Sequence, residues 1–340
     1  MERRLVTVRK VKQVEPIINS DNLDHVTVDG WKVVCKRNDF KVDDLALFYE
    51  IDSLLPVSPE YEFLRKSCYK KLVDGTEGMR LKTIKLRGAV SQGLLLPLST
   101  FPTMDFSDTE KDYTIDLGVT KWEPMTPAVL NGDAKGNFPT ELVFKTDQER
   151  IQNLPHWFDK YKNVEFECSI KLDGSSATYL WHNNQIRVCS RNLELKTEDV
   201  NNTFVKVGLE MELAEKFKDI NENFAIQGEL CGPGIGGNPM KLTKHQFFVF
   251  DIYNIDEHCY YTPTQRRRFC MFTDLPHVPV LVENMKPFEL SIEELIDFAD
   301  GTCAFNGTIR EGLVFKSTRL VDGELLHFKV INNKYLLKIE

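Results

Sequence analysis

The sequence predicts an α+β fold of two domains, because two different patterns of secondary structure are separated by a stretch that shows neither. The chain has 340 residues, of which 42% are hydrophobic, which is enough to form two cores. Short alternating strands fill the N-terminal third, proline and glycine gather in residues 121–140, and strands alternate with capped helices after that. We therefore expect a first domain over residues 1–125, a linker over 126–140 and a second domain over 141–340.

The first domain is predicted to be a small antiparallel barrel. Hydrophobic and polar residues alternate over five short segments, and Asp29-Gly30, Asp74-Gly75 and Gly88 provide turns between them. Closely spaced short strands joined by such turns are typical of small barrels. The expected strands are residues 5–11, 26–35, 45–48, 79–84 and 93–96.

Charge is distributed unevenly along the chain. The whole protein has a net charge of -8, which argues against a protein that coats nucleic acid without specificity. Residues 61–90, however, contain eight lysines and arginines against three acidic residues, a balance of 8 - 3 = +5. Tyr61, Phe63 and Tyr69 lie among these charges as candidate stacking partners, so the segment fits either a solvated face or a nucleic-acid platform.

The second domain is predicted to mix helices with strands. Thr262 and Pro263 mark the start of one helix, and Ser291 with Glu294 forms a capping box at the start of another. The run Arg266-Arg267-Arg268 on the first of these helices is interpreted as a solvated face, with a contact to RNA phosphate as the alternative. Expected helices are 202–217, 263–271 and 292–299, with a helix start in 146–153, and expected strands are 164–170, 185–190, 223–230, 246–253, 313–317 and 326–331.

Cysteine spacing and the N-terminal sequence limit the class of protein. The eight cysteines are scattered singly without a CxxC pair, which predicts reduced thiols and neither a disulfide framework nor a zinc site. The N-terminus lacks the apolar core of a signal peptide, and no apolar run reaches the length of a membrane span. We expect a soluble intracellular protein, with its compartment open, and a monomer because no coiled-coil pattern is present.

One short motif in the second domain suggests chemistry. Lys171-Leu172-Asp173-Gly174 follows an alternating apolar run, which predicts a strand that ends in a tight turn. Residues two apart on a strand share a face, so Lys171 and Asp173 point the same way, and Gly174 lets a ligand approach the backbone closely. Taken alone, the motif fits a solvated turn as well as it fits a lysine nucleophile.

Further candidate residues follow at the ends of the predicted strands. Lysine and arginine bind phosphates, carboxylates hold hydrated magnesium, and an aromatic face stacks on a base. Phe248 and Phe250 share one face of the strand over 246–253. Together these residues supply what binding a nucleoside triphosphate requires: Arg191, Glu229, Phe248, Phe250, Glu311 and Lys329.

The order of these motifs resembles the motif series of the covalent nucleotidyltransferases, which include RNA and DNA ligases and mRNA capping enzymes. The series runs Lys-x-Asp-Gly, Ser-Arg-Asn, Gly-Glu, Phe-Asp-Ile, Glu-Gly-Leu-Val and a final lysine, from Lys171 to Lys329. Only 11 residues follow Lys329, so we expect no C-terminal barrel. The segments GWKVVCKRNDFKVDDLALFYEIDSLLP and IKLRGAVSQGLLLPL are similar to the N-terminal oligonucleotide-binding (OB) domain of nick-sealing RNA ligases of the Naegleria type.

This resemblance implies both a fold and an activity. The fold would be an N-terminal OB-type β-barrel followed by a nucleotidyltransferase domain built on antiparallel sheets with flanking helices. The activity would be that of an ATP-dependent RNA ligase, which joins 5′-phosphate and 3′-hydroxyl ends through a lysyl-AMP and an RNA-adenylate. The implied cofactors are ATP and Mg²⁺ or Mn²⁺, and the implied partner is RNA, as nicked duplex or strand ends.

The resemblance also implies a role for each matching residue that binds phosphate or ribose. Lys171 would attack the α-phosphorus of ATP and hold AMP as a phosphoramidate, and Lys329 would bind the α-phosphate. Arg150, in the segment TDQERIQN, would hold the β- or γ-phosphate. Arg191 would contact the ribose or an incoming 5′-phosphate.

The remaining matches concern the base and a metal. Phe250, or Phe248 on the same face, would stack on adenine, and Gly174 would lie against the nucleotide. Glu229 would contact the ribose or orient metal-bound waters. The water shell of the divalent cation would be positioned by the three carboxylates of Asp173, Glu229 and Glu311.

The sequence departs from the family at His327, where motif V usually has a lysine. An imidazole with an ordinary pKa of about 6.5 is largely neutral at pH 7, so it provides no fixed charge there. A non-catalytic RNA-binding protein with a degenerate nucleotidyltransferase domain is therefore kept as an alternative function, as is a DNA ligase within the enzyme class. The domain order disfavours a guanylyltransferase.

Overall fold

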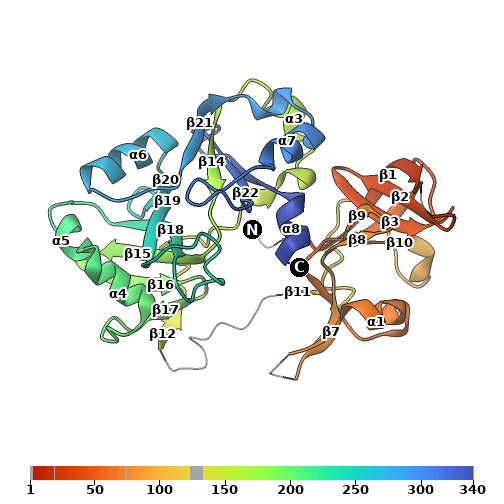
Figure 1. The fold of residues 1–340 in the computed structure, drawn as a ribbon, viewed down its shortest axis with the longest axis horizontal. Coiled ribbons are helices and arrows are strands. Elements are labelled where there is room, and N and C mark those ends of the chain that lie inside the picture. The colour runs from red at the N-terminus through yellow and green to blue at the C-terminus, as the bar shows by residue number, and fades with distance from the viewer. Residues whose placement is uncertain (1–2, 19, 73–74, 123–132, 340) are drawn as a thin grey trace. The chain divides into compact units, whose positions relative to one another are not determined.

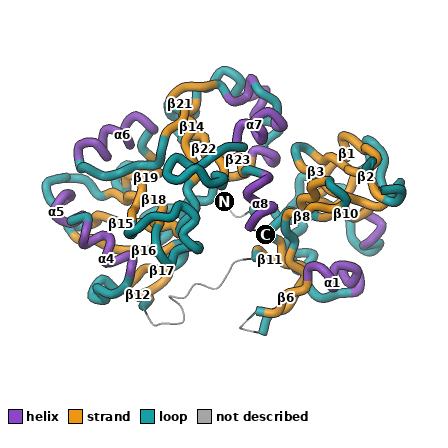
Figure 2. Tube along the Cα trace, in the orientation of Figure 1, coloured by secondary structure: helices purple, strands orange, loops and turns teal. Residues whose placement is uncertain are grey.

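A computed structural model of the protein describes residues 3–18, 20–72, 75–122 and 133–339. The chain divides into two compact units, which are Met1–Pro124 with Leu336–Glu340 and Met125–Tyr335. Strands and loops make up most of each unit (Figure 2). Residues 126–132 of the predicted linker lie outside the described residues, whereas Ala134–Asn137 form strand β12, which pairs with the sheet of the second unit.

The first unit is built from antiparallel strands in three sheets, and the largest of them, in the order β10-β4-β1-β2-β3, has the long strand β1 at its centre. The first half of β1 pairs with β4 and its second half pairs with β2, with a change of register between Val11 and Gln13. One strand thus belongs to two faces, which is how a small barrel curves. The strands are β1 (Val6–Pro16), β2 (Leu23–Val28), β3 (Trp31–Lys36), β4 (Leu45–Tyr49), β5 (Ser53–Leu55), β6 (Tyr69–Lys71), β7 (Glu77–Arg80), β8 (Thr83–Leu86), β9 (Ala89–Gln92), β10 (Leu94–Pro97) and β11 (Thr120–Lys121).

Strand boundaries in this unit differ from the prediction at two places. The segment 26–35 is a hairpin of β2 and β3 around Asp29-Gly30, and 79–84 joins the end of β7 to the start of β8. Between β5 and β6 lie the 3₁₀ helix η1 (Pro59–Leu64) and the short helix α1 (Arg65–Cys68). A further 3₁₀ turn, η2 (Leu98–Thr100), follows β10.

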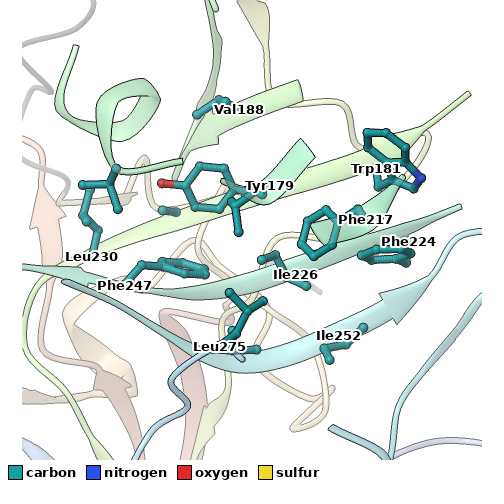
Figure 3. Close-up of a cluster of buried hydrophobic side chains, with 14 of the residues drawn as sticks. Tyr179, Trp181, Val188, Phe217, Phe224, Ile226, Leu230, Phe247, Ile252 and Leu275 are labelled. Carbon is teal, nitrogen blue, oxygen red and sulfur yellow. The ribbon is translucent and has the colours of Figure 1, made fainter. Parts of the chain in front are cut away.

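The second unit contains two sheets, of which the larger has seven strands in the order β12-β17-β16-β15-β18-β19-β20. Helices α4 (Thr203–Glu210), α5 (Leu213–Phe217) and α6 (Pro263–Phe272) lie against it (Figure 1). Figure 3 shows the core between them, where Tyr179 and Phe247 pack edge to face at 4.9 Å between ring centroids. The strands are β12 (Ala134–Asn137), β15 (Ser175–His182), β16 (Gln185–Ser190), β17 (Leu193–Leu195), β18 (Phe224–Cys231), β19 (Gln246–Asn254) and β20 (Cys259–Tyr260).

The smaller sheet of this unit has five strands in the order β13-β23-β22-β14-β21. Its strands pair antiparallel except for β13, which runs parallel to β23. Helix α7 (Ile292–Ala299) packs on this sheet through Leu295 and Ala299. The elements are β13 (Glu149–Arg150), β14 (Phe166–Lys171), β21 (Val280–Met285), β22 (Gly312–Ser317) and β23 (His327–Ile331), with 3₁₀ helices η3 (Ile151–Asn153) and η4 (Pro287–Glu289).

The helices follow their predicted start signals, with two exceptions. Thr262 caps α6 (Pro263–Phe272) and Ser291 caps α7 (Ile292–Ala299), each through a complete capping box, as predicted. The predicted helix 202–217 is instead two helices, α4 (Thr203–Glu210) and α5 (Leu213–Phe217), because Glu212 has φ +53, which an α-helix does not admit. The predicted helix start at 146–153 is wrong, since β13 and a 3₁₀ turn occupy it.

Two further helices complete the fold, α3 (Trp157–Lys160) and α8 (Asn333–Ile339). None of the helices in the described ranges is both long and apolar enough to cross a membrane. The segment Lys171-Leu172-Asp173-Gly174 has a special place in this topology, because it connects β14 of the five-stranded sheet to β15 of the seven-stranded sheet. The predicted lysine motif therefore lies where the two sheets of the unit meet.

Candidate active site

Lys171 is the last residue of β14 and pairs with Gly312 at the start of β22. Glu311 directly precedes that strand, so the pairing brings its carboxylate to the lysine, with Lys171 Nζ 2.8 Å from Glu311 Oε1. Both side chains are mostly buried, at 25% and 17% exposure. Lys171 and Glu311 therefore form an ion pair that is largely shielded from water.

Three carboxylates determine the charge state of Lys171. Burial alone lowers the pKa of Lys171, but attraction to Glu311, Glu229 and Asp173 outweighs it, so the pKa lies above the ordinary value of a lysine. Burial, opposed in part by Lys171, raises the pKa of Glu229 to about 7. The amine is therefore protonated at neutral pH in the absence of ligand.

The segment Lys171-Leu172-Asp173-Gly174, called the lysine turn below, lies close to β18, and Gly174 permits this close approach. Its N–H donates to Glu229 Oε1 at 3.0 Å. A Cβ at Gly174 would meet the carbonyl oxygen of Leu230 at 2.4 Å and Cys231 Sγ at 2.8 Å, so no other residue fits without displacing the backbone. The glycine predicted from the motif is thus required by packing between β15 and β18.

Tyr335 of α8, which was not predicted as a site residue, donates a hydrogen bond from its hydroxyl to Asp173 Oδ2. Burial raises the pKa of Tyr335, and that of Asp173 as well. A cavity beside the lysine is lined by Lys171, Asp173, Glu311 and Tyr335, and by Met240 and Cys303 on its apolar side. No local pattern marks Tyr335, since its partner is 162 residues away in the sequence.

Predicted phosphate-binding residues gather around a second missed residue, Asp147. Lys329 Nζ lies 2.9 Å from Asp147 Oδ1, and Arg191 Nη2 lies 3.5 Å from Asp147 Oδ2. Arg150 is the neighbour of Lys329 in the parallel pairing of β13 with β23. Lys329 and Arg191, from separate parts of the sequence, thus share one carboxylate that is 33% exposed, and Arg150 lies beside Lys329 across the strand pair.

The two predicted stacking residues share a face of β19, as expected, but differ in exposure. Both belong to the apolar cluster around Ile170 and Leu172. Phe248 is 5% exposed and packs against Phe305, with ring centroids 5.1 Å apart. Phe250 is half-buried and retains the more accessible ring. Phe250 is accordingly the better placed of the two to stack on a base.

His327 lies on β23 opposite Lys316 of β22. Burial lowers the pKa of His327, and the neighbouring Lys316 and Lys329 lower it further against the attraction of Asp251. Among the described residues, its Nδ1 atom is buried without a hydrogen-bond partner. The imidazole is therefore neutral at pH 7, and the fixed cation of this strand is Lys329.

The predicted residues form three groups. The lysine group contains Lys171, Asp173, Gly174, Glu229 and Glu311, and the phosphate group contains Arg150, Arg191 and Lys329. Phe248 and Phe250 form the third group, which adjoins the first because Phe248 pairs with Glu229 across β18 and β19. The pairing of β22 with β23 links the lysine group to the phosphate group.

The basic segment of the first unit is largely exposed. Lys66, Lys70, Lys71, Lys85 and Arg87 are exposed, whereas Tyr61 is 1% exposed and belongs to the core, so its prediction as a stacking partner is wrong. Phe63 is 62% exposed. Tyr69 is half-buried beneath the Arg65 guanidinium, which lies 4.9 Å from its ring centroid.

The fold and this site define a two-domain protein in which an OB-fold domain precedes a ligase-type nucleotidyltransferase domain. An OB-fold domain model matches residues 5–98, and the RNA ligase family model matches residues 164–331. No curated protein matches the chain.

Solved structures extend the likeness over the full chain. An RNA ligase of Naegleria gruberi solved with PPi is 38% identical, with a TM-score of 0.91 over 99% of each chain. A mutant of that ligase solved with ATP and Mn is 37% identical, with a TM-score of 0.89 over 98% of each chain. Another mutant, solved with AMP and Mn, is 38% identical, with a TM-score of 0.90 over 98% of each chain. The chain belongs to the RNA ligase family, and it is an enzyme of that class.

Proposed function

We propose that the protein is an ATP-dependent RNA ligase that seals 5′-phosphate and 3′-hydroxyl ends, with nicked duplex as the favoured substrate, through AMP bound covalently to Lys171. The observation that carries the proposal is the buried Lys171 amine at a strand end, 2.8 Å from Glu311 and beside Glu229 and Asp173. The similar ligases solved with ATP and with AMP support ATP as the nucleotide.

In the first step the neutral amine of Lys171 attacks the α-phosphorus of ATP. The ammonium group of Lys171 gives one proton to solvent before it attacks. A phosphorus–nitrogen bond then forms, the bond between the α-phosphorus and the bridging oxygen breaks with release of pyrophosphate, and the nitrogen gives its second proton to solvent. The cations Lys329 and Arg150 bind the phosphates and stabilise the negative charge that moves to the leaving oxygen. Arg191 contacts the ribose or the 5′-phosphate of the incoming RNA, and Glu229 contacts the ribose.

In the second step the 5′-phosphate of the RNA attacks the same phosphorus and releases Lys171, which takes up a proton. The RNA then carries AMP on its 5′ end. In the third step the 3′-hydroxyl attacks the RNA 5′-phosphorus, gives its proton to solvent and expels AMP. Each step exchanges one phosphorus bond for another, so positioning and charge provide the catalysis.

The residues around Lys171 fit a divalent cation held through water. Asp173, Glu229 and Glu311 are hard oxygen donors of the kind that Mg²⁺ and Mn²⁺ prefer. Within the described part of the chain, no three acidic, histidine or cysteine side chains are arranged to ligate an ion directly. When bound, the cation supplies positive charge that offsets the charge of the α-phosphate.

Asp147 pairs with Lys329 and Arg191 and therefore competes with the nucleotide phosphates for them. The contact of Asp147 with Arg191 is long and partly exposed, so its net contribution to stability is small. We infer that Asp147 holds these two cations in place before the nucleotide arrives.

Incubation with ATP labelled at the α-phosphate tests the proposal. The protein should retain the label through denaturing electrophoresis, because the bond to Lys171 is covalent, while Lys171→Ala should retain none. ATP labelled at the γ-phosphate should leave wild type unlabelled, since that phosphate departs with pyrophosphate. If wild type takes up no label from α-labelled ATP (the α-label), the proposal is overturned.

The strand requirement is tested with nicked duplexes. The nicked duplexes compared are identical except that the 3′-terminal nucleotides of each strand are either RNA or DNA. The difference in sealing reveals which 2′-hydroxyls are needed. An RNA ligase should lose sealing when ribose is removed at the 3′-hydroxyl end. Equal sealing of every all-DNA nick would make the protein a DNA ligase as well.

A further inference from the structure

The run Arg266-Arg267-Arg268 on α6 is not the solvated face predicted from the sequence. Arg268 is exposed, but Arg266 is 1% exposed. Its Nη2 atom donates to Glu167 Oε1 at 2.7 Å, and its Nη1 atom donates to the carbonyl oxygen of Phe250 at 3.2 Å. Glu167, on β14, also accepts a hydrogen bond from Arg267. A helical arginine thus reaches across to the strand that carries the proposed base-stacking ring.

A second buried cation contacts the same carbonyl group. Lys316 of β22 is 2% exposed, and its Nζ donates to the Phe250 oxygen at 2.5 Å. The amine also pairs with Asp251, the next residue on β19, and lies 5.5 Å from the centroid of the Phe250 ring. Lys316 therefore holds Phe250 by its backbone and by a cation–π contact with its ring.

The local backbone explains why this carbonyl oxygen needs side-chain donors. Gln227 pairs with Asp251 and Gly228 pairs with Val249, so Phe250 is the additional residue of a β-bulge. A bulge interrupts the ladder of backbone hydrogen bonds at its extra residue and re-aims the side chain. Lys316 and Arg266 donate to the carbonyl oxygen of that residue, from a different sheet and from a helix.

The energetics of this cluster favour a positioning role. Two cations, Lys316 and Arg266, are balanced by two carboxylates, Asp251 and Glu167, and all four are at most 5% exposed. Burying four charges is costly, and apolar side chains of similar volume often stabilise a core as well or better. Unlike apolar side chains, these four charged groups fix the positions of the atoms that they bind.

We propose that Lys316 and Arg266 are positioning residues that hold the bulge at Phe250 and thereby aim its ring at the nucleotide base. The inference rests on the proposed function, because it assumes that Phe250 stacks on that base. Neither residue touches the reacting phosphate. Their loss should therefore weaken the binding of ATP while leaving the maximal rate of lysyl-AMP formation largely intact.

Paired substitutions test this without leaving an unpaired buried charge. Lys316→Met with Asp251→Asn removes one cation and its carboxylate, and Arg266→Gln with Glu167→Gln removes the other pair. Each should raise the ATP concentration for half-maximal labelling by about tenfold, equivalent to about 1.4 kcal/mol of binding free energy. The maximal rate should stay within about twofold, which such a loss of base contact permits. The exposed Arg268→Gln is the matched control, and Lys316→Arg, which keeps a donor, should retain most of the ATP affinity.

A second readout separates positioning from a merely structural role. In a Phe250→Ala background the paired substitutions should cause no further loss of ATP affinity, because the ring they aim is gone. Ribose triphosphate without a base, used as a competitor of ATP, should bind wild type and the paired variants equally. Circular dichroism and thermal unfolding establish that each variant is folded.

Each negative result would overturn a different one of these claims: the positioning role, the base-stacking role or the proposed function. Folded paired variants with wild-type half-saturation for ATP would overturn the positioning role, as would losses that add fully to that of Phe250→Ala. An unchanged ATP affinity in Phe250→Ala itself would overturn both this inference and the base-stacking role. Failure of the proposed function is separate, since wild type would then take up no α-label at all.

Discussion

Gly174 lies where the lysine turn passes closest to β18, and its lack of a side chain is a requirement of packing. A Cβ there would meet the carbonyl oxygen of Leu230 at 2.4 Å. Gly136 of β12 has nothing within 4 Å of the corresponding position. The same substitution at these two glycines therefore separates close packing from a general effect of replacing glycine.

Gly174→Ala should push the lysine turn away from Glu229 and abolish most lysyl-AMP formation. Overpacking of this kind typically also lowers the free energy of unfolding, by about 1–3 kcal/mol. Labelling with α-labelled ATP and urea unfolding measure the two effects. Gly136→Ala should change neither, and an active Gly174→Ala would show that the turn tolerates displacement.

Tyr335→Phe should slow the formation of lysyl-AMP by about 10- to 100-fold, since a hydrogen bond to a charged group contributes about 1.5–3 kcal/mol. The substitution keeps the ring in the cavity and removes only the hydroxyl that donates to Asp173. Single-turnover labelling at saturating ATP measures the rate. Tyr261→Phe is the control, because that hydroxyl donates to Glu222 at 3.0 Å outside the candidate site. Equal rates for both variants would assign Tyr335 to packing alone.

The residues of the motifs were predictable from the sequence, whereas the residues that act through tertiary contacts were not. Lys171 is at the end of β14 because an apolar alternating run precedes it, and such a run is visible in the sequence. Arg266, Tyr335 and Asp147 were missed as part of the site because their partners lie far along the chain. A helical arginine looks the same in sequence whether its guanidinium is solvated or reaches a buried carboxylate.

At the scale of elements, the site depends on the passage of the chain from one sheet to the other. β14 belongs to the five-stranded sheet and β15 to the seven-stranded sheet. The segment between them therefore contacts carboxylates from both sheets: Lys171 pairs with Glu311, next to β22 of the five-stranded sheet, and Gly174 donates to Glu229 of β18 in the seven-stranded sheet. Strand positions were largely predictable from alternation, whereas the crossover between sheets depends on pairing that alternation does not specify.

The strand β12 is attached to its sheet by Glu194 of β17. Its carboxylate accepts from Arg187 at 2.7 Å and 3.0 Å and from Lys135 of β12 at 3.0 Å. Hydrogen bonds from Arg187, aided by Lys135, hold the pKa of Glu194 below its ordinary value. Such a carboxylate stabilises the fold above its unfolded pKa, about 4.3, and this stabilisation disappears as the pH falls through the folded pKa.

Glu194→Gln should therefore destabilise the protein at pH 7, and the difference from wild type should shrink as the pH is lowered below about 4. Urea unfolding of both proteins at a series of pH values measures it. A difference that stays constant with pH would mean that Glu194 contributes through packing and not through its charge.

At the scale of the whole molecule, we propose that the two units have separate chemical tasks. The residues proposed to form lysyl-AMP all belong to Met125–Tyr335, and the exposed basic residues of the segment 61–90 belong to Met1–Pro124. A nucleic-acid contact through these lysines and arginines should depend strongly on salt, because each neutralised phosphate releases counterions.

Replacing Lys70, Lys71, Lys85 and Arg87 by glutamine should weaken RNA binding and reduce its salt dependence without altering lysyl-AMP formation. Binding to a nicked RNA duplex over a range of salt concentrations measures the first effect, and α-label uptake measures the second. Lys36→Gln with Lys41→Gln, which are exposed in the same unit outside the segment, is the control. Equal losses in both sets would indicate a diffuse effect of net charge.

The most direct test of the central claim follows the AMP from Lys171 to the sealed product. Enzyme labelled with AMP, freed of ATP and pyrophosphate and mixed with a nicked RNA duplex, should seal about one nick per bound AMP and release the label as free AMP, since one AMP is consumed per phosphodiester. Label that stays on the protein while nicks remain open, or sealing that requires further ATP, would contradict the lysyl-AMP mechanism.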